Sequence, residues 1–212
     1  MIFNNAQQAF EFYYNEIKNL GVDYRDTKTL FNQGFTIKNP LDNHINTDFR
    51  SWNLNYAKAE FDWYLSGDRN LKKLEEYYGL VPKIWQSMSD SEGNVNSNYG
   101  WQWNRSQQLK KVIDILKEDL YSRRASISIY DAKEIDTYFK DTPCTYAVHF
   151  YYNNNSLNMS VMMRSNDLWF GFCNDQYCFS ELQRIVAKEL NLKVGEYFHF
   201  VNNLHLYNRN IF

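Results

Sequence analysis

Apolar side chains recur every three or four residues in four parts of the chain, and this spacing predicts amphipathic helices. The four sets are Phe10, Tyr13, Tyr14 and Ile17; Leu54, Ala57, Phe61, Tyr64 and Leu65; Leu109, Val112, Ile113 and Leu116; and Leu182, Ile185, Val186 and Leu190. Glycine commonly follows a helix, so the first helix is predicted to end at Gly21 and the second at Gly67. Residues 69–78 are predicted to form a short charged helix.

Strands are predicted where apolar and polar residues alternate between turn-forming residues. Residues 27–38 predict one strand or two, and residues 126–129 alternate strictly. Residues 145–152 and 157–163 flank three asparagines, which favours a hairpin. Two last strands are predicted over roughly 196–207. Helices that alternate irregularly with hairpin strands are typical of an α+β fold, and the length of 212 residues predicts one domain over 1–212.

Composition excludes several classes of function. The 23 basic and 25 acidic side chains give a net charge of −2, whereas a dedicated nucleic-acid binder usually has a basic surplus. The N-terminal residues lack the basic segment of a secretory signal, and no stretch approaches the length of an apolar membrane span. We therefore expect a cytoplasmic protein that contacts neither membrane nor nucleic acid directly. Aromatic residues, at 18%, can build a core and also flat walls for a planar ligand.

A long polar segment lies between the short charged helix predicted over residues 69–78 and the helix predicted around Leu109. Residues 87–100 are rich in turn formers and are bordered by aromatic residues. These are Trp85, Tyr99, Trp101 and Trp103. A loop of this length inside a compact domain is more often functional than idle.

The three cysteines offer one candidate nucleophile among them. An odd number in a chain without a signal peptide argues against a disulfide framework. Cys144, Cys173 and Cys178 are each also consistent with a small buried apolar residue. A zinc site of Cys173, Cys178, His199 and His205 is an alternative, although its spacings match no known ribbon or finger, and no metal is expected.

Three arginines and one glutamate are further candidates. Arg123 and Arg124 lie at a predicted helix-to-strand junction, and Arg164 precedes Ser165 at a predicted strand end. Forked guanidinium donors and a hydroxyl suit a phosphate, and a solvated turn is the alternative. Glu60 stands on an otherwise apolar and aromatic helix, where a helix-surface carboxylate is the alternative. The residues alone thus predict an α+β domain with an anion site.

Seven segments, in order from about residue 50 onward, resemble the motifs of the thymidylate synthase superfamily. They are residues 59–68 around Glu60, Ile84-Trp85, residues 98–103 with Tyr99 and Gly100, Ser122-Arg123-Arg124, Pro143-Cys144, residues 164–167 with Gly171, and His205-Leu206-Tyr207. The resemblance implies a mixed β-sheet with flanking helices and a two-fold dimer through the sheet.

The resemblance also implies a role for each matched residue. Cys144 would be the nucleophile, with Glu60 and Tyr99 in the catalytic group. The phosphate would be held by Arg164, Ser165 and the Arg123 and Arg124 of the partner subunit, and the nucleotide by Asn166, His205 and Tyr207. The one-carbon donor would be 5,10-methylenetetrahydrofolate, beside Trp85, Asp167 and Gly171.

Within the superfamily the chain most resembles the phage deoxycytidylate hydroxymethylases. Residues 82–86, 96–101 and 164–172 are similar to that branch. Thymidylate synthases carry an asparagine where this chain has Asp175, and a carboxylate can accept from the 4-amino group of cytosine and share a proton with N3. Asp175 therefore favours dCMP over dUMP, while Asn174 is not the matching position. A phage-encoded enzyme acting in the host cytoplasm is implied.

The implied chemistry is covalent. Addition of the Cys144 thiolate to C6 makes C5 of the pyrimidine nucleophilic, with Arg164 lowering the thiol pKa. C5 then attacks the one-carbon unit, and Glu60 organises water and proton transfers. Water gives a hydroxymethyl product, whereas hydride gives a methyl product.

Three departures from the superfamily pattern bear on this interpretation. The N-terminal phosphate loop differs, so that Arg25 or Lys28 is expected to substitute for its basic residue, and Thr145 follows the nucleophile. The chain ends at Phe212, soon after Tyr207, which argues against hydride transfer because that step depends most on a dry site. A dUMP-directed or methyl-forming enzyme, a CMP-specific variant and a non-catalytic nucleotide-binding descendant stay as alternatives.

Overall fold

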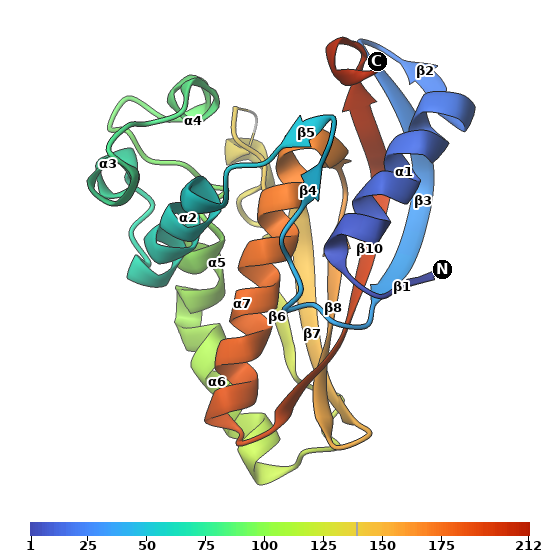
Figure 1. The fold of residues 1–212 in the computed structure, drawn as a ribbon. Helices are drawn as coiled ribbons and strands as arrows, with labels where there is room; N and C mark the ends of the chain where they lie inside the picture. The colour runs from blue at the N-terminus through green and yellow to red at the C-terminus, as the bar shows by residue number, and fades with distance from the viewer. Residues whose placement is uncertain (139) are drawn as a thin grey trace.

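A mixed β-sheet with helices packed on it organises the fold, as the computed structural model of residues 1–138 and 140–212 shows (Figure 1). The strand order is β1-β3-β10-β8-β7-β6, with β2 on β3 and β9 on β10. Their bounds are β1 Ile2–Phe3, β2 Val22–Tyr24, β3 Thr27–Ile37, β6 Ser126–Ser128, β7 Thr145–Asn153, β8 Ser156–Met163, β9 Asn166–Asp167 and β10 Lys193–Tyr207. β10 runs antiparallel to β3 and parallel to β8, which makes the sheet mixed and confirms the predicted α+β class.

The helices lie to one side of this sheet (Figure 1). They are α1 Ala6–Leu20, α2 Leu54–Ser66, α3 Leu71–Tyr78, α4 Lys83–Met88, α5 Tyr99–Asn104, α6 Gln108–Glu118 and α7 Cys173–Glu189. Both α1 and α7 contact the sheet directly, whereas α2 packs on α7 and α3 packs on α2. A separate two-stranded ribbon, β4 Asn46–Thr47 and β5 Arg50–Ser51, precedes α2.

Asparagine side chains start four of these helices. Asn5, Asn53, Asn70 and Asn98 each accept a hydrogen bond from a backbone N–H of the first turn of α1, α2, α3 and α5. Such caps satisfy donors that have no partner within the helix. The predicted stop of α2 is confirmed, because Gly67 has the left-handed conformation (φ 66°) that favours glycine. The caps therefore fix where α2 and α5, which carry Glu60 and Tyr99, begin.

The prediction of two strands at the C-terminal end is wrong. β10 is one strand, and it accommodates a register shift against β8 between Val194 and Tyr197. Asn202 and Asn203, which resemble a turn in sequence, lie inside the strand: the Asn202 amide donates to the Asn32 side chain at 3.0 Å. Asn32 in turn has a positive φ (55°), and it lies opposite Asn202 at a position where neither strand pairs, so the register of β3 with β10 is the same on both sides. The uninterrupted strand carries His205 and Tyr207 to the end of the sheet.

The last predicted helix is longer than its apolar spacing indicated. α7 starts at Cys173 rather than near Leu182, and a π-helical turn, Leu168–Phe172, runs directly into it. The first turns of α7 carry polar side chains, including Asp175, which hide the helical period from the sequence. The hairpin over residues 145–163 is confirmed, with Asn154 and Asn155 both at positive φ in its turn.

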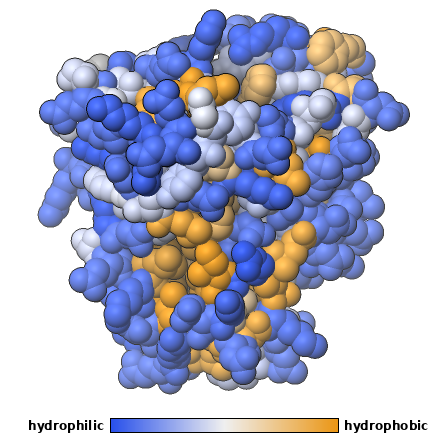
Figure 2. All heavy atoms as spheres, turned by 60° about the vertical axis from the view of Figure 1, so that its left-hand side comes forward, coloured by the Kyte–Doolittle hydropathy of each residue, from blue (hydrophilic) through white to orange (hydrophobic). Residues whose placement is uncertain are grey.

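Helices bury one face of the sheet more completely than the other. In β10, Tyr197, His199 and Val201 are buried against the helices, whereas Phe198 and Phe200 on the other face are half-buried. Figure 2, which brings α2, α3 and α4 forward, shows mostly hydrophilic side chains with an apolar area in the lower half. Among the described residues, no helix is both long and apolar enough to cross a bilayer.

His199 gives the fold a pH dependence. It is fully buried between Phe35 and Phe172, and burial lowers its pKa to about 3. The unfolded chain takes up the proton near pH 6.5. The contribution of the buried neutral His199 to the free energy of unfolding is therefore fully present above that pH and is lost as the pH drops toward 3. We expect His199 to contribute a loss of about 1.4 kcal/mol per pH unit in this window.

Urea unfolding between pH 6 and pH 4 measures this loss. The slope of unfolding free energy against pH should be smaller in a His199→Phe variant than in the unsubstituted protein. Equal slopes would show that His199 is not the titrating group.

Candidate active site

The pairing of β7 with β8 brings Cys144 and Arg164 together. Cys144 immediately precedes β7, Arg164 immediately follows β8, and the Arg164 backbone N–H donates to the Cys144 carbonyl at 2.8 Å. The guanidinium donates from Nε to the Pro143 carbonyl (3.0 Å) and from Nη2 to the Thr142 carbonyl (2.7 Å). Its Nη2 then lies 3.7 Å from Cys144 Sγ. Two backbone carbonyls thus hold the guanidinium, which is always positively charged, beside the thiol.

The charge state of Cys144 is set by two opposing effects. Burial raises the pKa of the thiol to about 11, Arg164 opposes this, and the carboxylates of Asp175, Asp141 and Asp167 add to the rise. Cys144 is therefore a protonated thiol in this state, with Arg164 as the neighbour that favours the thiolate. Deprotonation at neutral pH requires a change in these surroundings, such as a bound group that neutralises a carboxylate.

A carboxylate–amide pair forms beside this thiol. The Asn166 amide donates to Asp175 Oδ2 at 2.7 Å, and burial raises the pKa of Asp175 to about 7 although Asn166 opposes the rise. A Cβ at Gly171 would lie 2.9 Å from Asn166 Nδ2, so a larger residue there would displace the Asn166 amide. Asp167 starts the π-helical turn by accepting from the Trp169 N–H at 2.9 Å. Such turns occur frequently at functional sites.

Glu60 is buried, so its interpretation as a helix-surface carboxylate is wrong. It is only 4% exposed, and its Oε1 accepts from the Tyr56 hydroxyl at 3.0 Å. The Tyr56 oxygen itself accepts from Trp85 Nε1 at 2.7 Å. Burial, with a further contribution from Asp175, raises the pKa of Glu60 to about 8. A carboxyl with this pKa can take up or release a proton near neutral pH.

Tyr99 lies in the wall behind these carboxylates. Its ring packs on Phe179 and Tyr64, with ring centres 5.2 Å and 5.7 Å apart. Burial, with Asp175 and Cys144 nearby, raises the pKa of its phenol well above the usual range. A Cβ on the next residue, Gly100, would overlap the Tyr64 carbonyl, which explains the glycine after Tyr99.

The end of β10 adds a histidine and a tyrosine to the same edge of the sheet. His205 pairs with Asp167 of β9, and the rings of His205 and Tyr207 meet edge-on with centres 5.5 Å apart. Tyr207 pairs with Thr27, which places the β2–β3 turn beside it (Figure 1). Of the two basic residues expected there, Arg25 is exposed at positive φ, whereas Lys28 Nζ donates to the Lys18 carbonyl.

Arg123 and Arg124 are not brought to this cluster within one chain. Both are exposed in the connection between α6 and β6, at the opposite end of the sheet (Figure 1). The neighbouring Ala125 carbonyl accepts from Phe150, six residues along from Cys144. At about 3.3 Å per strand residue this separation is roughly 20 Å. Ser165, by contrast, directly follows Arg164 and lies with the cluster.

Sequence reasoning missed three neighbours of the site. Tyr56 lies four residues before Glu60, a spacing that puts both on one helix face and could have signalled the contact. Arg50 Nε donates to the Trp169 carbonyl at 3.2 Å, and no local pattern indicated it. The Trp52 indole donates to Asn174 at 2.8 Å, so Asn174 is engaged with Trp52 and not with the Asn166 amide.

The four side chains of the alternative zinc site do not assemble. The Cys173 thiol lies 3.4 Å from the Trp169 carbonyl, the Cys178 thiol 4.0 Å from the Ala57 carbonyl, and His199 Nδ1 2.8 Å from the Tyr197 hydroxyl. Within residues 1–138 and 140–212, no group of three or more His, Cys, Asp or Glu side chains could hold a metal ion.

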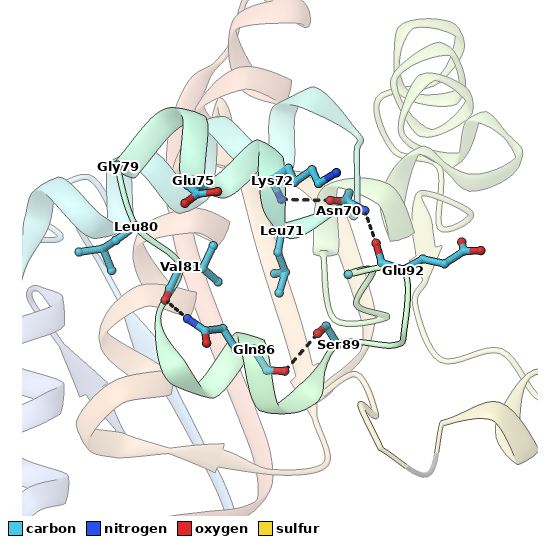
Figure 3. A pocket seen from close by; sticks show the side chains of 11 residues that line it. Asn70, Leu71, Lys72, Glu75, Gly79, Leu80, Val81, Gln86, Ser89 and Glu92 are labelled. Carbon is cyan, nitrogen blue, oxygen red and sulfur yellow. Dashed lines mark hydrogen bonds between the residues drawn. The ribbon is translucent and has the colours of Figure 1, made fainter.

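A separate hollow of about 440 Å³ lies between α3, α4 and residues 89–93 (Figure 3). Its polar side chains bond within its own wall: Gln86 donates to the Val81 carbonyl and Asn70 to the Glu92 carbonyl. Of the residues that line it, none belongs to the candidate site, although Gln86 follows Trp85. The hollow is therefore not the site of the chemistry.

Comparison with known proteins gives relatives of two kinds at more than 30% identity. The chain is 33% identical over 181 residues to the deoxycytidylate 5-hydroxymethyltransferase of Enterobacteria phage T4, covering 77% of this chain and 71% of that protein. It is 31% identical over 160 residues to the thymidylate synthase of Buchnera aphidicola subsp. Acyrthosiphon pisum (strain APS), covering 72% of this chain. The match spans 59% of the length of that synthase.

The fold and the family model complete the comparison. The structure superposes on a thermostable thymidylate synthase A from Bacillus subtilis with a TM-score of 0.80 at 23% identity, covering 97% of this chain and 81% of that one. This likeness confirms the predicted thymidylate synthase-like fold. The thymidylate synthase family model matches residues 14–211. The chain belongs to the thymidylate synthase family.

Proposed function

We propose that the protein is a dCMP hydroxymethylase, which transfers a one-carbon unit from 5,10-methylenetetrahydrofolate to C5 of dCMP and adds water to give 5-hydroxymethyl-dCMP. The observation that carries the proposal is the Asn166–Asp175 pair beside Cys144. A similar protein, from phage T4, is named deoxycytidylate 5-hydroxymethyltransferase. By this similarity we also propose a phage origin and a role in DNA base modification.

Base selection follows from the chemistry of Asp175. With a pKa near 7, this carboxyl exists in both protonation states at neutral pH. Its oxygens accept from the 4-amino group of cytosine, and a shared proton bridges to N3. Uracil presents O4 and N3–H instead, so the ionised carboxylate has no donor for O4, and buried unpaired polar groups are costly. The Asn166 amide holds the carboxyl through Oδ2.

The covalent step uses Cys144 and Arg164. The Sγ–C6 bond forms while the C5–C6 π electrons move to C5, which becomes the nucleophile, and Sγ leaves at the end as C5–C6 is restored. Arg164, held by two carbonyls, stabilises the thiolate before the bond forms. 5,10-Methylenetetrahydrofolate supplies the one-carbon unit at C5. Trp85 and Asp167 would hold it, since an indole face suits a pterin ring and a carboxylate accepts from pterin N–H groups.

Glu60 serves the proton transfers. The C5 proton must leave, and the added water must lose a proton as its oxygen bonds to the new carbon. A buried carboxyl with a pKa of about 8 can hold a water and move these protons. In the proposed reaction Tyr99 orders the wall beside the substrate ring.

The phosphate site requires a second subunit in this proposal. Arg164 and Ser165 come from one chain, whereas Arg123 and Arg124 lie roughly 20 Å away along the strand direction. A two-fold dimer through the open sheet face, which carries the half-buried Phe198, Phe200 and Met162, would exchange these arginines between sites. His205 and Tyr207 would bind the sugar 3′-hydroxyl.

Subunit mixing tests the shared site. The Cys144→Ala variant and an Arg123→Ala/Arg124→Ala double variant should each be nearly inactive. Random reassociation of equal amounts should restore about a quarter of the unsubstituted activity, because half of the dimers are hybrids and each hybrid has one intact site. Activity that stays at the level of the separate variants would contradict exchange of arginines between subunits.

A tritium-release assay tests the proposed function. dCMP and dUMP labelled at C5 are incubated with and without 5,10-methylenetetrahydrofolate, and the label appearing in water is counted. We expect folate-dependent release from dCMP at least about a hundredfold faster than from dUMP. Faster release from dUMP would support a thymidylate synthase-type activity, to which the 31% identity with a thymidylate synthase also points. Release from neither would support a non-catalytic nucleotide-binding protein.

A further inference from the structure

We propose that Tyr56 is a positioning residue for Glu60: oriented by the Trp85 indole, its hydroxyl occupies one carboxylate oxygen of Glu60 and leaves the other oxygen to exchange protons with the substrate and water. The inference deepens the proposed function and rests on Glu60 being its proton-transfer group. It is carried by a chain of two hydrogen bonds from α4 to α2, Trp85 Nε1 to Tyr56 Oη at 2.7 Å and Tyr56 Oη to Glu60 Oε1 at 3.0 Å.

The direction of these bonds is fixed by chemistry. An indole N–H can only donate, so Tyr56 accepts from Trp85 and keeps its single proton for Glu60. Burial, followed by the charge of Glu60, raises the pKa of Tyr56 far above its ordinary value of 10, so the hydroxyl stays protonated. Glu60 Oε1 is therefore always an acceptor in this arrangement. A proton taken up by Glu60 is therefore favoured on Oε2, the oxygen that Tyr56 does not occupy.

The packing around Tyr56 makes this orientation rigid. Tyr56 and Glu60 lie one turn apart on α2, so their side chains share a helix face. Trp85 packs edge-on against Trp63 of the same helix, with ring centres 5.5 Å apart, and Tyr78 packs edge-on against Tyr56 at 5.1 Å. Trp85, on the side of the proposed folate site, thus holds the Tyr56 hydroxyl that donates to Glu60. The protonation state of Glu60 is therefore linked to the position of Trp85.

The groups facing Glu60 act on its ionisation in both directions. Asp175 and Cys178 approach it from α7, and Tyr56 and Tyr64 lie on α2. Asp175 raises the pKa of Glu60. The Tyr56 hydroxyl, by contrast, lowers this pKa most among the donors, followed by Tyr64 and Trp85. Removing the hydroxyl leaves a buried carboxyl without a main stabiliser of its charged form. The fraction of Glu60 available as a base at neutral pH should then fall.

The test compares Tyr56→Phe with Tyr78→Phe as the matched control. Each substitution removes one phenol oxygen from the same aromatic pair, but the Tyr78 oxygen accepts from the exposed Asn53 amide and does not contact Glu60. Glutamate labelled with ¹³C at the side-chain carboxyl reports the titration of Glu60, and Glu60→Gln assigns the signal. This readout needs no substrate, so it stays valid if the proposed function fails.

We expect Tyr56→Phe to move the Glu60 titration upward by about one pH unit, because a hydrogen bond to a charged group has been lost. Tyr78→Phe should leave it in place, and Trp85→Phe should move it upward by less. With whichever nucleotide the unsubstituted protein turns over, kcat for Tyr56→Phe should fall about tenfold below pH 7, with KM for the nucleotide within about twofold. An unchanged or lowered Glu60 titration in Tyr56→Phe would overturn the inference.

Discussion

Replacing Cys144 with alanine is expected to abolish product formation while dCMP still binds. Sγ is the atom that forms the bond to C6 in the proposed reaction, and loss of a nucleophile commonly costs on the order of 10⁴-fold or more in kcat. The base, sugar and phosphate contacts do not depend on Sγ. Single-turnover assays measure the loss, and calorimetric titration with dCMP measures binding.

Cys178→Ala is the matched control for this substitution. Its thiol is also buried, and the charges of Glu60 and Asp175 also raise its pKa. It lies in the core, however, against the Ala57 carbonyl. The control should be less stable because the core loses a buried sulfur, yet it should retain turnover when assayed below its unfolding temperature. Undiminished activity of Cys144→Ala would show that another group is the nucleophile.

The second large effect is expected on base preference. Asp175→Asn should change the ratio of kcat/KM for dCMP to that for dUMP by at least about 10³-fold in favour of dUMP. With its NH₂ group toward C4, the amide donates to O4 of uracil and its oxygen accepts from N3–H, whereas in the same orientation it meets the 4-amino group of cytosine donor to donor. Initial rates with each nucleotide at limiting concentration give the ratio.

Asn174→Asp is the control for the substitution at 175. Asn174 is the adjacent residue, but it accepts from the Trp52 indole and lies outside the Asn166–Asp175 pair. Its replacement should leave the preference for dCMP within about threefold, since no base contact changes. An unchanged preference in Asp175→Asn would mean that a different group selects the base.

Much of the secondary structure could be predicted because local physics dominated it. The helical spacing around Phe10 and around Phe61, the Gly67 stop and the asparagine turn after β7 all have the predicted structure. The errors arose where tertiary contacts overruled local signals. Asn202 and Asn203 lie within β10 because β3 pairs along the whole segment and Asn32 accepts from the Asn202 amide, and a single sequence does not reveal such a partner.

The candidate site could also be predicted from the sequence only in part. The order of the motifs was sufficient to single out Cys144, Arg164 and Asp175, and the structure places these three in one cluster. The burial of Glu60 could not be predicted, because it depends on α4 and α7 folding over α2, whereas the four-residue spacing from Tyr56 is visible in the sequence. Which carboxylate oxygen of Glu60 accepts from the Tyr56 hydroxyl can be seen only in the three-dimensional structure.

The most direct measurement is the mass of the nucleotide product after incubation with 5,10-methylenetetrahydrofolate and, separately, dCMP, dUMP and CMP. A dCMP hydroxymethylase adds the elements CH₂O to dCMP and leaves dUMP and CMP unchanged. A gain of CH₂ instead, or a gain on dUMP in preference to dCMP, would contradict the proposal and make the protein a methyl-forming or uracil-directed member of its family.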